Sequence, residues 1–430
     1  MREMKYSGVE WMEDIPASWN MIRFKDKYQS IKEIAGESSS EYERLALTLG
    51  GVIKRPKDDS EGLQPKAFDG YQILRENDFV FKMIDLQNVS TSRVGLSPYT
   101  GLVSPAYIRF CSKNKNQFNK FVYYYLMSMY YNCVFNSLGG DGVRSALNAS
   151  DMGMLMIPFP SEHEQMLIVE AIESQTDKVD AIIANQEAQI VKLKAYKQSL
   201  ITEVVTKGLD PNVPMKDSGI EEIGQVPTHW SIYRAKYIAS SLEKGSGITK
   251  EDVLENGDIQ CVRYGEIYSK YDGGFSTTCS RTKLSAISSP QHINYGDILL
   301  AGTGELVEEI GKNIVYLGAE PCLAGGDIIV MRHSQDPVFL NYAMNSISSQ
   351  MQKSKGKAKL KVVHISATNI GNVLIALPPI EEQIIIGKYL DEKCNNIDRL
   401  VEIKKQKIEK LNQYKKSLIY EYVTGKKEVQ

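Results

Sequence analysis

Five lysines occupy every second position between residues 353 and 361, in the run Lys-Ser-Lys-Gly-Lys-Ala-Lys-Leu-Lys. In an extended segment alternate side chains point the same way, so this spacing would place five ammonium groups on one face. Like charges repel one another unless an anion lies opposite, and a nucleic-acid backbone is such an anion. The pattern therefore predicts a DNA contact, with a solvated charge run on a surface loop as the alternative. The lysines are Lys353, Lys355, Lys357, Lys359 and Lys361.

A glycine-rich turn occupies the corresponding place in the first half of the chain, where Gly139 and Gly140 precede Arg144. Glycines allow the backbone to approach DNA closely, and an arginine can bond a guanine edge or a phosphate. The alternative is an ordinary flexible loop. Other candidates for DNA contact lie in further polar or glycine-rich segments: Arg93, Lys244, Ser246, Arg263 and Tyr264.

Residues suited to covalent chemistry or metal binding are sparse. The segment 300–304, Leu-Ala-Gly-Thr-Gly, faintly resembles a glycine-rich cofactor loop, but the sequence has no Asn/Asp-Pro-Pro-aromatic motif of the kind a DNA methyltransferase uses. The six cysteines form no C-x-x-C pair, and the histidines show no metal-ligand spacing. Reduced cysteines acting as small hydrophobes fit this pattern. We therefore expect no catalytic residue, no metal site and no cofactor bound by this chain.

Composition is that of a globular protein, with 42% apolar and 24% charged residues among 430. The net charge of −2 argues at first against a nucleic-acid partner, but binding depends on where the charge lies. Residues 20–155 hold 17 basic and 14 acidic side chains, and residues 228–373 hold 15 and 14. No apolar run approaches the ~20 residues of a membrane span, and the N-terminus lacks a signal-peptide core. We expect a cytoplasmic protein.

An internal repeat organises the segments that carry these candidates. Near the start of each copy the offset between matching residues is 211, and near its end the offset is 218, so the second copy holds seven more residues in its middle. Such long matches in the same order indicate a tandem duplication. The matched segments are 7–10 with 218–221, 15–19 with 226–230, 164–165 with 382–383, and 196–206 with 414–424.

Each copy ends in a segment with the features of a long helix. Residues 161–207 contain neither Pro nor Gly, Ser161 and Glu164 fit a capping box, and Gly208 follows. At 1.5 Å per residue this helix would be roughly 70 Å long. A stripe of apolar residues runs along the segment 161–207, and a matching stripe runs along 380–424. These stripes predict that the two helices pair as an antiparallel coiled coil. The alternative is two amphipathic helices, each lying on its own domain.

The predicted fold class is α+β, with two mixed α/β domains separated by two long helices and related as a pseudo-two-fold tandem repeat. The expected boundaries are 1–155 and 216–373 for the two mixed domains, and 156–215 and 374–430 for the two helical spacer regions. Antiparallel pairing would set the two domains at opposite ends. DNA has the same local two-fold symmetry, so such a protein could contact two half-sites at a fixed separation.

The paired helix starts at 160–165 and 379–383 resemble those of specificity subunits of type I restriction–modification systems. Four shorter motifs add to the resemblance, which covers essentially the whole chain: 104–107 (Ser-Pro-Ala-Tyr), 263–265 (Arg-Tyr-Gly), 296–299 (Gly-Asp-Ile-Leu) and 322–326 (Cys-Leu-Ala-Gly-Gly).

The resemblance implies a non-catalytic subunit that recognises a bipartite double-stranded DNA target. It also implies two modification subunits that methylate adenine and restriction subunits that translocate and cleave DNA. S-adenosylmethionine, ATP and Mg would then be bound by these partners. The helical regions would dock equivalent partners twice. Two other hypotheses remain at this point: a free-standing DNA methyltransferase or nuclease with a degenerate site around 302–305, and a coiled-coil scaffold that binds no DNA.

Overall fold

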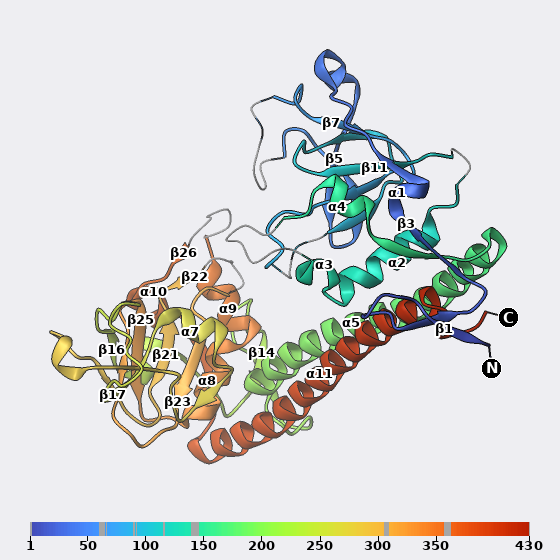
Figure 1. Cartoon of the computed structure of the whole chain (residues 1–430). Coiled ribbons are helices and arrows are strands. Elements are labelled where there is room, and N and C mark those ends of the chain that lie inside the picture. Colours follow the sequence, from blue (N-terminus) through green and yellow to red (C-terminus); the bar gives the residue numbers. More distant parts are fainter. Residues whose placement is uncertain are drawn as a thin grey trace. The chain divides into compact units, whose positions relative to one another are not determined.

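The computed structural model describes residues 2–59, 65, 67–88, 91, 93–114, 117–138, 146–304, 309–356 and 363–429. The chain forms two compact units: unit 1 contains Met1–Gln186 and Gln406–Gln430, and unit 2 contains Glu187–Lys405. Figure 1 colours the strands of unit 1 from blue to green and those of unit 2 from yellow-green to orange. Each unit combines a β-rich domain with one part of each long helix, α5 (Glu162–Lys207) and α11 (Ile380–Val423).

The domain of unit 1 consists mainly of short strands, with helices placed between them. The helices are α1 (Phe24–Lys27), α2 (Lys120–Tyr131), α3 (Val134–Ser137) and α4 (Ala149–Gly153). The strands are β1 (Met4–Tyr6), β2 (Asp14–Pro16), β3 (Asn20–Arg23), β4 (Tyr28–Ser30), β5 (Arg44–Thr48), β6 (Gly51–Arg55), β7 (Gln72–Leu74), β8 (Phe79–Phe81), β9 (Val94–Leu96), β10 (Gly101–Val103), β11 (Ile108–Ser112) and β12 (Met156–Phe159).

The domain of unit 2 has the same kind of composition. Its helices are α6 (Ala235–Ile238), α7 (Tyr264–Ser269), α8 (Pro337–Asn345), α9 (Ile347–Ser354) and α10 (Ala367–Gly371). Its strands are β13 (Met215–Asp217), β14 (Gln225–Pro227), β15 (Ser231–Arg234), β16 (Ala239–Lys244), β17 (Ile259–Val262), β18 (Gly274–Phe275), β19 (Ser280–Thr282), β20 (His292–Ile293), β21 (Ile298–Ala301), β22 (Thr303–Gly304), β23 (Asn313–Tyr316), β24 (Cys322–Ala324), β25 (Ile328–His333), β26 (Val363–His364) and β27 (Leu374–Leu377).

Sheet topology repeats strand by strand between the units. The order β6-β5-β10-β7 in unit 1 corresponds to β19-β17-β24-β20 in unit 2. In each of these sheets the central pair, β5–β10 or β17–β24, is parallel. The order β4-β11-β8-β9 likewise corresponds to β16-β25-β21-β23, and β18 extends the second of these sheets. The duplication predicted from the sequence is therefore present in the fold.

Buried strands carry the apolar runs expected of central strands. In unit 1, β8 reads Phe-Val-Phe, and in unit 2, β21 reads Ile-Leu-Leu-Ala; every one of these residues is buried. The core of unit 1 extends onto Ile168 of α5 and Leu418 of α11. The core of unit 2 extends onto Ile201 of α5 and Ile386 of α11. Each domain thus packs on the beginning of one long helix and the end of the other.

Contacts between α5 and α11 run in opposite directions along the two helices within each unit. In unit 1, Gln175 donates to Tyr422 at 2.6 Å, and Lys415 donates to Asp180 at 2.5 Å. In unit 2, Lys197 donates to Asp398 at 2.7 Å, and Lys404 donates to Gln189 at 2.5 Å. As residue numbers rise on α5 they fall on α11, so the predicted antiparallel pairing is confirmed.

The predicted helix bounds agree with the structure to within one residue, 161–207 against Glu162–Lys207 and 380–424 against Ile380–Val423. Gly208 follows α5 with φ +78°, the left-handed conformation expected of a C-terminal cap. The predicted boundaries at 155, 215 and 373 stay predictions, because the compact units divide each long helix instead of separating it from its domain. No helix in the described ranges is long and apolar enough to cross a membrane.

The residues that repeat in sequence hold the helix ends onto the domains. In unit 2, Trp230 donates its Nε1 proton to Glu382 at 3.1 Å, beside Gly208 at the end of α5. In unit 1, Arg2 donates to Glu164 at 2.5 Å and lies over the Trp19 ring, which adjoins Gly425. These motifs therefore have a structural role at matched junctions.

Candidate nucleic-acid interface

Glycine-rich segments at the ends of β16, β17 and β24 meet in unit 2. Gly245 lies so close to Gly325 that a Cβ on Gly245 would fall 2.0 Å from the Gly325 carbonyl oxygen. The backbone of Ser246 donates to Ala324 at 2.7 Å, and the backbone of Gly325 donates to Val262 at 2.7 Å. The structure thus brings the segment that holds Lys244 and Ser246 together with two motifs noted in the sequence, 263–265 and 322–326, which lie far from it in the chain.

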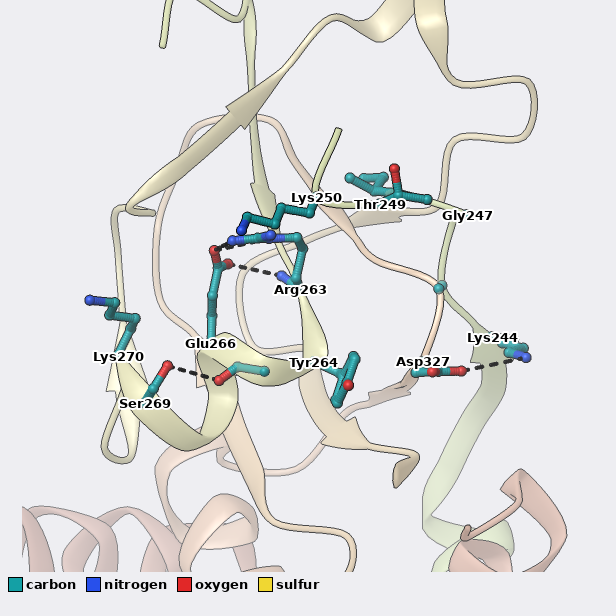
Figure 2. Close-up of a pocket in the computed structure, with 14 residues that line it drawn as sticks. Lys244, Gly247, Thr249, Lys250, Arg263, Tyr264, Glu266, Ser269, Lys270 and Asp327 are labelled. Atoms are coloured by element: carbon teal, nitrogen blue, oxygen red, sulfur yellow. Dashed lines mark hydrogen bonds and ion pairs between the residues drawn. The ribbon is translucent and has the colours of Figure 1, made fainter. Parts of the chain in front are cut away.

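These segments line a pocket of about 840 Å³ that is open to solvent, which we call the α7 pocket. Its wall carries the cations Lys244, Lys250, Arg263 and Lys270 and the carboxylates Glu266 and Asp327 (Figure 2). The positive charges therefore outnumber the negative ones. Tyr264, which is 42% exposed, adds an aromatic ring to the same wall. A concave, cationic surface with an aromatic ring is suited to bind nucleic acid.

Arg263 is held within the pocket by Glu266, as the dashed lines in Figure 2 mark. Its Nε and Nη2 atoms donate to Oε1 of Glu266 at 3.2 and 2.8 Å, and its backbone N–H donates to Oε2 at 2.9 Å. Ser280 donates to the same Oε1 atom. The hydrogen bond and the charge of Glu266 raise the pKa of Arg263, so its guanidinium stays protonated.

The connection that forms the α7 pocket in unit 2 is built differently in unit 1. There, β5 passes directly into β6 through the turn Leu49-Gly50, with Thr48 and Gly51 paired across it. In unit 2, residues 263–279 lie between the corresponding strands β17 and β19 and include α7. The scaffold is therefore repeated while this connection differs.

Two predicted DNA contacts are corrected by their surroundings. Arg93 is only 1% exposed, and its guanidinium donates to the carbonyl oxygens of Lys82, Ile84, Asp85 and Asn88 at 2.7 to 3.2 Å. Ser246 is 3% exposed, and its hydroxyl accepts from the backbone of Gln291 at 2.5 Å. Both side chains hold loops together inside the protein, so neither presents itself to DNA.

Lys353 is a further correction. It lies in α9 instead of an extended segment, and it is 3% exposed. Its ammonium donates to the carbonyl oxygens of Gly311 and Met344, each at 2.7 Å, and to Oδ1 of Asn313 at 3.3 Å. Burial lowers its pKa to about 7. Lys353 therefore joins α9 to neighbouring segments of unit 2.

The remaining predicted residues fall into two groups. Lys355 is exposed and lies 3.1 Å from Glu222, outside the α7 pocket. Lys244 is also exposed, with its ammonium 3.9 Å from Asp327 at the pocket edge. The others lie outside the described residues, so their DNA contacts stay predictions: Gly139, Gly140, Arg144, Lys357, Lys359 and Lys361.

Sequence reasoning missed Glu266, Ser280, Lys250 and Lys270. The spacing of Arg263 and Glu266, three residues apart at a helix start, is the signal that was available for Glu266. In the segment 300–304, Leu300 and Ala301 end β21, Thr303 and Gly304 form β22, and Gly302 lies between the two strands, where a Cβ would lie 2.9 Å from the Asp327 carbonyl oxygen. Within the described ranges, no cluster of His, Cys, Asp or Glu is placed to hold a metal ion.

Two copies of one mixed α/β domain, each packed on parts of two antiparallel helices and one of them with a cationic pocket, define a duplicated class of protein whose surface suits nucleic acid. The family described as type I restriction modification DNA specificity domain matches residues 52–192 and 227–413. These matches cover more than half of the sequence, so the chain belongs to this family.

Curated relatives match this chain over nearly its full length. The type I restriction enzyme MjaVIII specificity subunit of Methanocaldococcus jannaschii is 25% identical and is matched over 96% of this chain and 93% of its own. The putative type I restriction enzyme MjaX specificity subunit of the same organism is 23% identical, over 96% and 94%. A solved chain described as "Structural basis underlying complex assembly and conformational transition of the type I R-M system" has a TM-score of 0.67 at 15% identity, over 95% and 98%.

The predicted fold class and family are therefore confirmed. The chain is a DNA target-recognition subunit of a type I restriction–modification system, which is a non-catalytic role, and it acts with other subunits of that system. The hypotheses of a free-standing methyltransferase or nuclease and of a scaffold that binds no DNA are set aside.

Proposed function

We propose that the two units read different halves of one bipartite DNA target. The observation that carries this proposal is the repeated strand order combined with the different connection in each unit, Leu49-Gly50 in unit 1 and residues 263–279 in unit 2. A common scaffold approaches DNA in a common way, whereas different reading segments recognise different bases. The length of the α5–α11 pair sets the gap between the half-sites.

Two identical modification subunits bind this chain, one at each unit. In unit 2, exposed Tyr196 and Leu400 flank the ion pair between Lys197 and Asp398. Tyr196 precedes that lysine by one residue, and Leu400 follows that aspartate by two. Exposed apolar residues beside a repeated ion pair favour docking of a protein partner.

Unit 1 presents the same arrangement. There, exposed Tyr414 and Ile182 flank the ion pair between Lys415 and Asp180 at the matching positions. One patch per unit, made of equivalent residues, fits one copy of the same partner per unit.

Chemistry is supplied by the partners. The modification subunits bind S-adenosylmethionine and methylate adenine, and restriction subunits use ATP and Mg to translocate and cleave DNA. The complex works in the cytoplasm on double-stranded DNA. This assignment is supported by family membership and needs no cofactor on the present chain.

Methylated adenines mapped across a genome that carries the whole system test the bipartite reading directly. We expect one split sequence whose two halves differ. Inserting four residues, about one helical turn or roughly 6 Å, at matched places in α5 and α11 should lengthen the gap and leave both halves unchanged. A change in either half, or an undivided target, would contradict the division of labour.

Native mass spectrometry tests the stoichiometry. Tyr196→Asp should reduce the complex from two modification subunits to one, and Tyr414→Asp should do the same independently. Combining both changes should remove both subunits. The matched control is Val191→Asp, an exposed α5 position whose counterpart in the other copy, Glu409, is already acidic. Full assembly by the double variant would contradict docking at these patches.

A further inference from the structure

The guanidinium of Arg263 has hydrogen-bonding capacity left over. An arginine carries five N–H groups, and Glu266 accepts from the Nε and Nη2 atoms. Among the described residues, none accepts a hydrogen bond from Nη1. The side chain is 29% exposed and lines the α7 pocket, so solvent or a ligand can reach it. The edge that carries Nη1 is therefore available to a planar pair of acceptors.

Glu266 fixes the orientation of that edge. Its carboxylate is 7% exposed and is tied at one oxygen to the Arg263 side chain and Ser280 and at the other to the Arg263 backbone. Because these bonds form at the start of α7, the helix and the arginine are positioned together. A side chain held in advance loses little further freedom when it binds, which favours both affinity and selectivity.

The ion pair also decides which ligand chemistry suits Arg263. The Glu266 charge cancels much of the attraction that a free guanidinium exerts on a phosphate, but leaves the directional N–H groups intact. Lys244, Lys250 and Lys270 line the same pocket without such a buried carboxylate partner, and they suit the phosphates. The charge of Arg263 is largely offset by Glu266, but its N–H groups can still donate hydrogen bonds. Such an arginine suits the neutral edge of a base, and guanine offers adjacent O6 and N7 acceptors.

We propose that Arg263, positioned by Glu266, recognises the O6 and N7 atoms of one guanine in the half-site read by unit 2. The proposal rests on the proposed function, in which each unit reads its own half-site. The matched connection of unit 1 presents Leu49, which is 66% exposed, instead of an arginine. Recognition of a guanine by this arginine is therefore confined to the half-site read by unit 2.

The experiment uses the full chain assembled with its modification subunits and the duplex identified by methylation mapping. Each guanine in the unit 2 half-site is replaced in turn by 7-deazaguanine, which lacks the N7 acceptor. The natural protein should lose roughly 5- to 100-fold in affinity at one position. Arg263→Ala should bind the natural duplex more weakly and should not respond to 7-deazaguanine at that position, whereas Arg263→Lys, whose ammonium can still donate to N7, should bind more weakly and respond less than the natural protein does.

Controls separate base reading from charge and from folding. Lys270→Ala, in the same pocket, should weaken binding to all duplexes alike and lower the salt dependence by about one counterion. Glu266→Gln should reduce the difference in affinity between guanine and 7-deazaguanine at the position that Arg263→Ala affects. Glu266→Asp, which keeps the negative charge, should retain part of that difference. Circular dichroism and thermal unfolding verify that each variant is folded.

Two outcomes overturn the proposal. In one, 7-deazaguanine has no effect at any position of the unit 2 half-site. In the other, Arg263→Ala and Arg263→Lys respond to 7-deazaguanine as the natural protein does. The proposed function fails differently, because the natural protein would then show no split target in the methylation map. A split target without a guanine that depends on Arg263 would reject only the present inference.

Discussion

Replacing Lys353 with methionine should change how the stability of unit 2 depends on pH. Methionine has a similar length, so it fills the same space while removing the ammonium. Burial lowers the pKa of Lys353 to about 7 in the folded protein, from an ordinary value of 10.5. Between these two pH values the unfolded chain holds a proton at this residue that the folded chain has released.

The direction of the effect follows from proton linkage. Where the unfolded state binds more protons, the free energy of unfolding rises with pH. The natural protein should therefore gain stability relative to Lys353→Met as the pH rises above 7, and the two should run parallel below about pH 6. With 1.36 kcal/mol per pKa unit, the gain between pH 7 and pH 9 amounts to about 2 kcal/mol.

Urea unfolding at a series of pH values measures this difference. Trp230 lies in the core of unit 2, whereas Trp11 and Trp19 lie in unit 1. Both proteins are therefore studied in a Trp11→Phe, Trp19→Phe background, in which fluorescence reports on unit 2 alone. Parallel stability curves between pH 7 and pH 9 would refute the reasoning. That result would mean that the three oxygens around the Lys353 ammonium keep it charged at these pH values.

Three further predictions concern other buried or close contacts. Arg93→Met should lower the stability of unit 1 by roughly 3 kcal/mol in denaturant titrations, because it leaves buried carbonyl groups without a donor, and DNA affinity of the folded protein should not change. Gly245→Ala should destabilise unit 2 by about 1–3 kcal/mol, because its Cβ would meet backbone at 2.0 Å; unchanged thermal unfolding would contradict this. A double-mutant cycle of Lys197→Ala with Asp398→Asn should give a coupling of about 0.5–1 kcal/mol that falls with added salt, and no coupling at low salt would argue against the ion pair.

The parts of the fold that local sequence determines could be predicted, and the parts that depend on distant partners could not. Helix α5 could be bounded because its cap residues, its lack of Pro and Gly, and Gly208 are all local signals. The burial of Lys353 could not be predicted from the alternating lysines. Its acceptors are oxygens of Gly311, Asn313 and Met344, which come from elsewhere in unit 2. A charged residue was read as exposed, whereas tertiary acceptors make its burial possible.

The same distinction explains the mixed result for the candidate site. Arg263 and Arg93 are both arginines in polar segments, and apart from the spacing of Arg263 and Glu266 their sequence neighbours do not tell them apart. The guanidinium of Arg93 donates hydrogen bonds to four carbonyl oxygens of one loop. The guanidinium of Arg263 donates to a single carboxylate, and its side chain stays partly exposed. Only the acceptors that each side chain meets in the fold separate a structural arginine from one available to DNA.

Divergence and repetition in this chain follow different physical constraints. The shared residues Glu164 and Glu382 hold the ends of the helices against matched domains, so a change in either copy removes contacts that join a long helix to its domain. The connection that contains α7 lies between two strands whose pairing it does not determine, because the corresponding strands of unit 1 pair through a two-residue turn. A segment of that kind can change in length and chemistry while the sheet persists. New DNA specificity can therefore arise within 263–279 while the repeated strand order persists, provided that the contact of Asp272 with Lys197 of α5, at 3.1 Å, is kept.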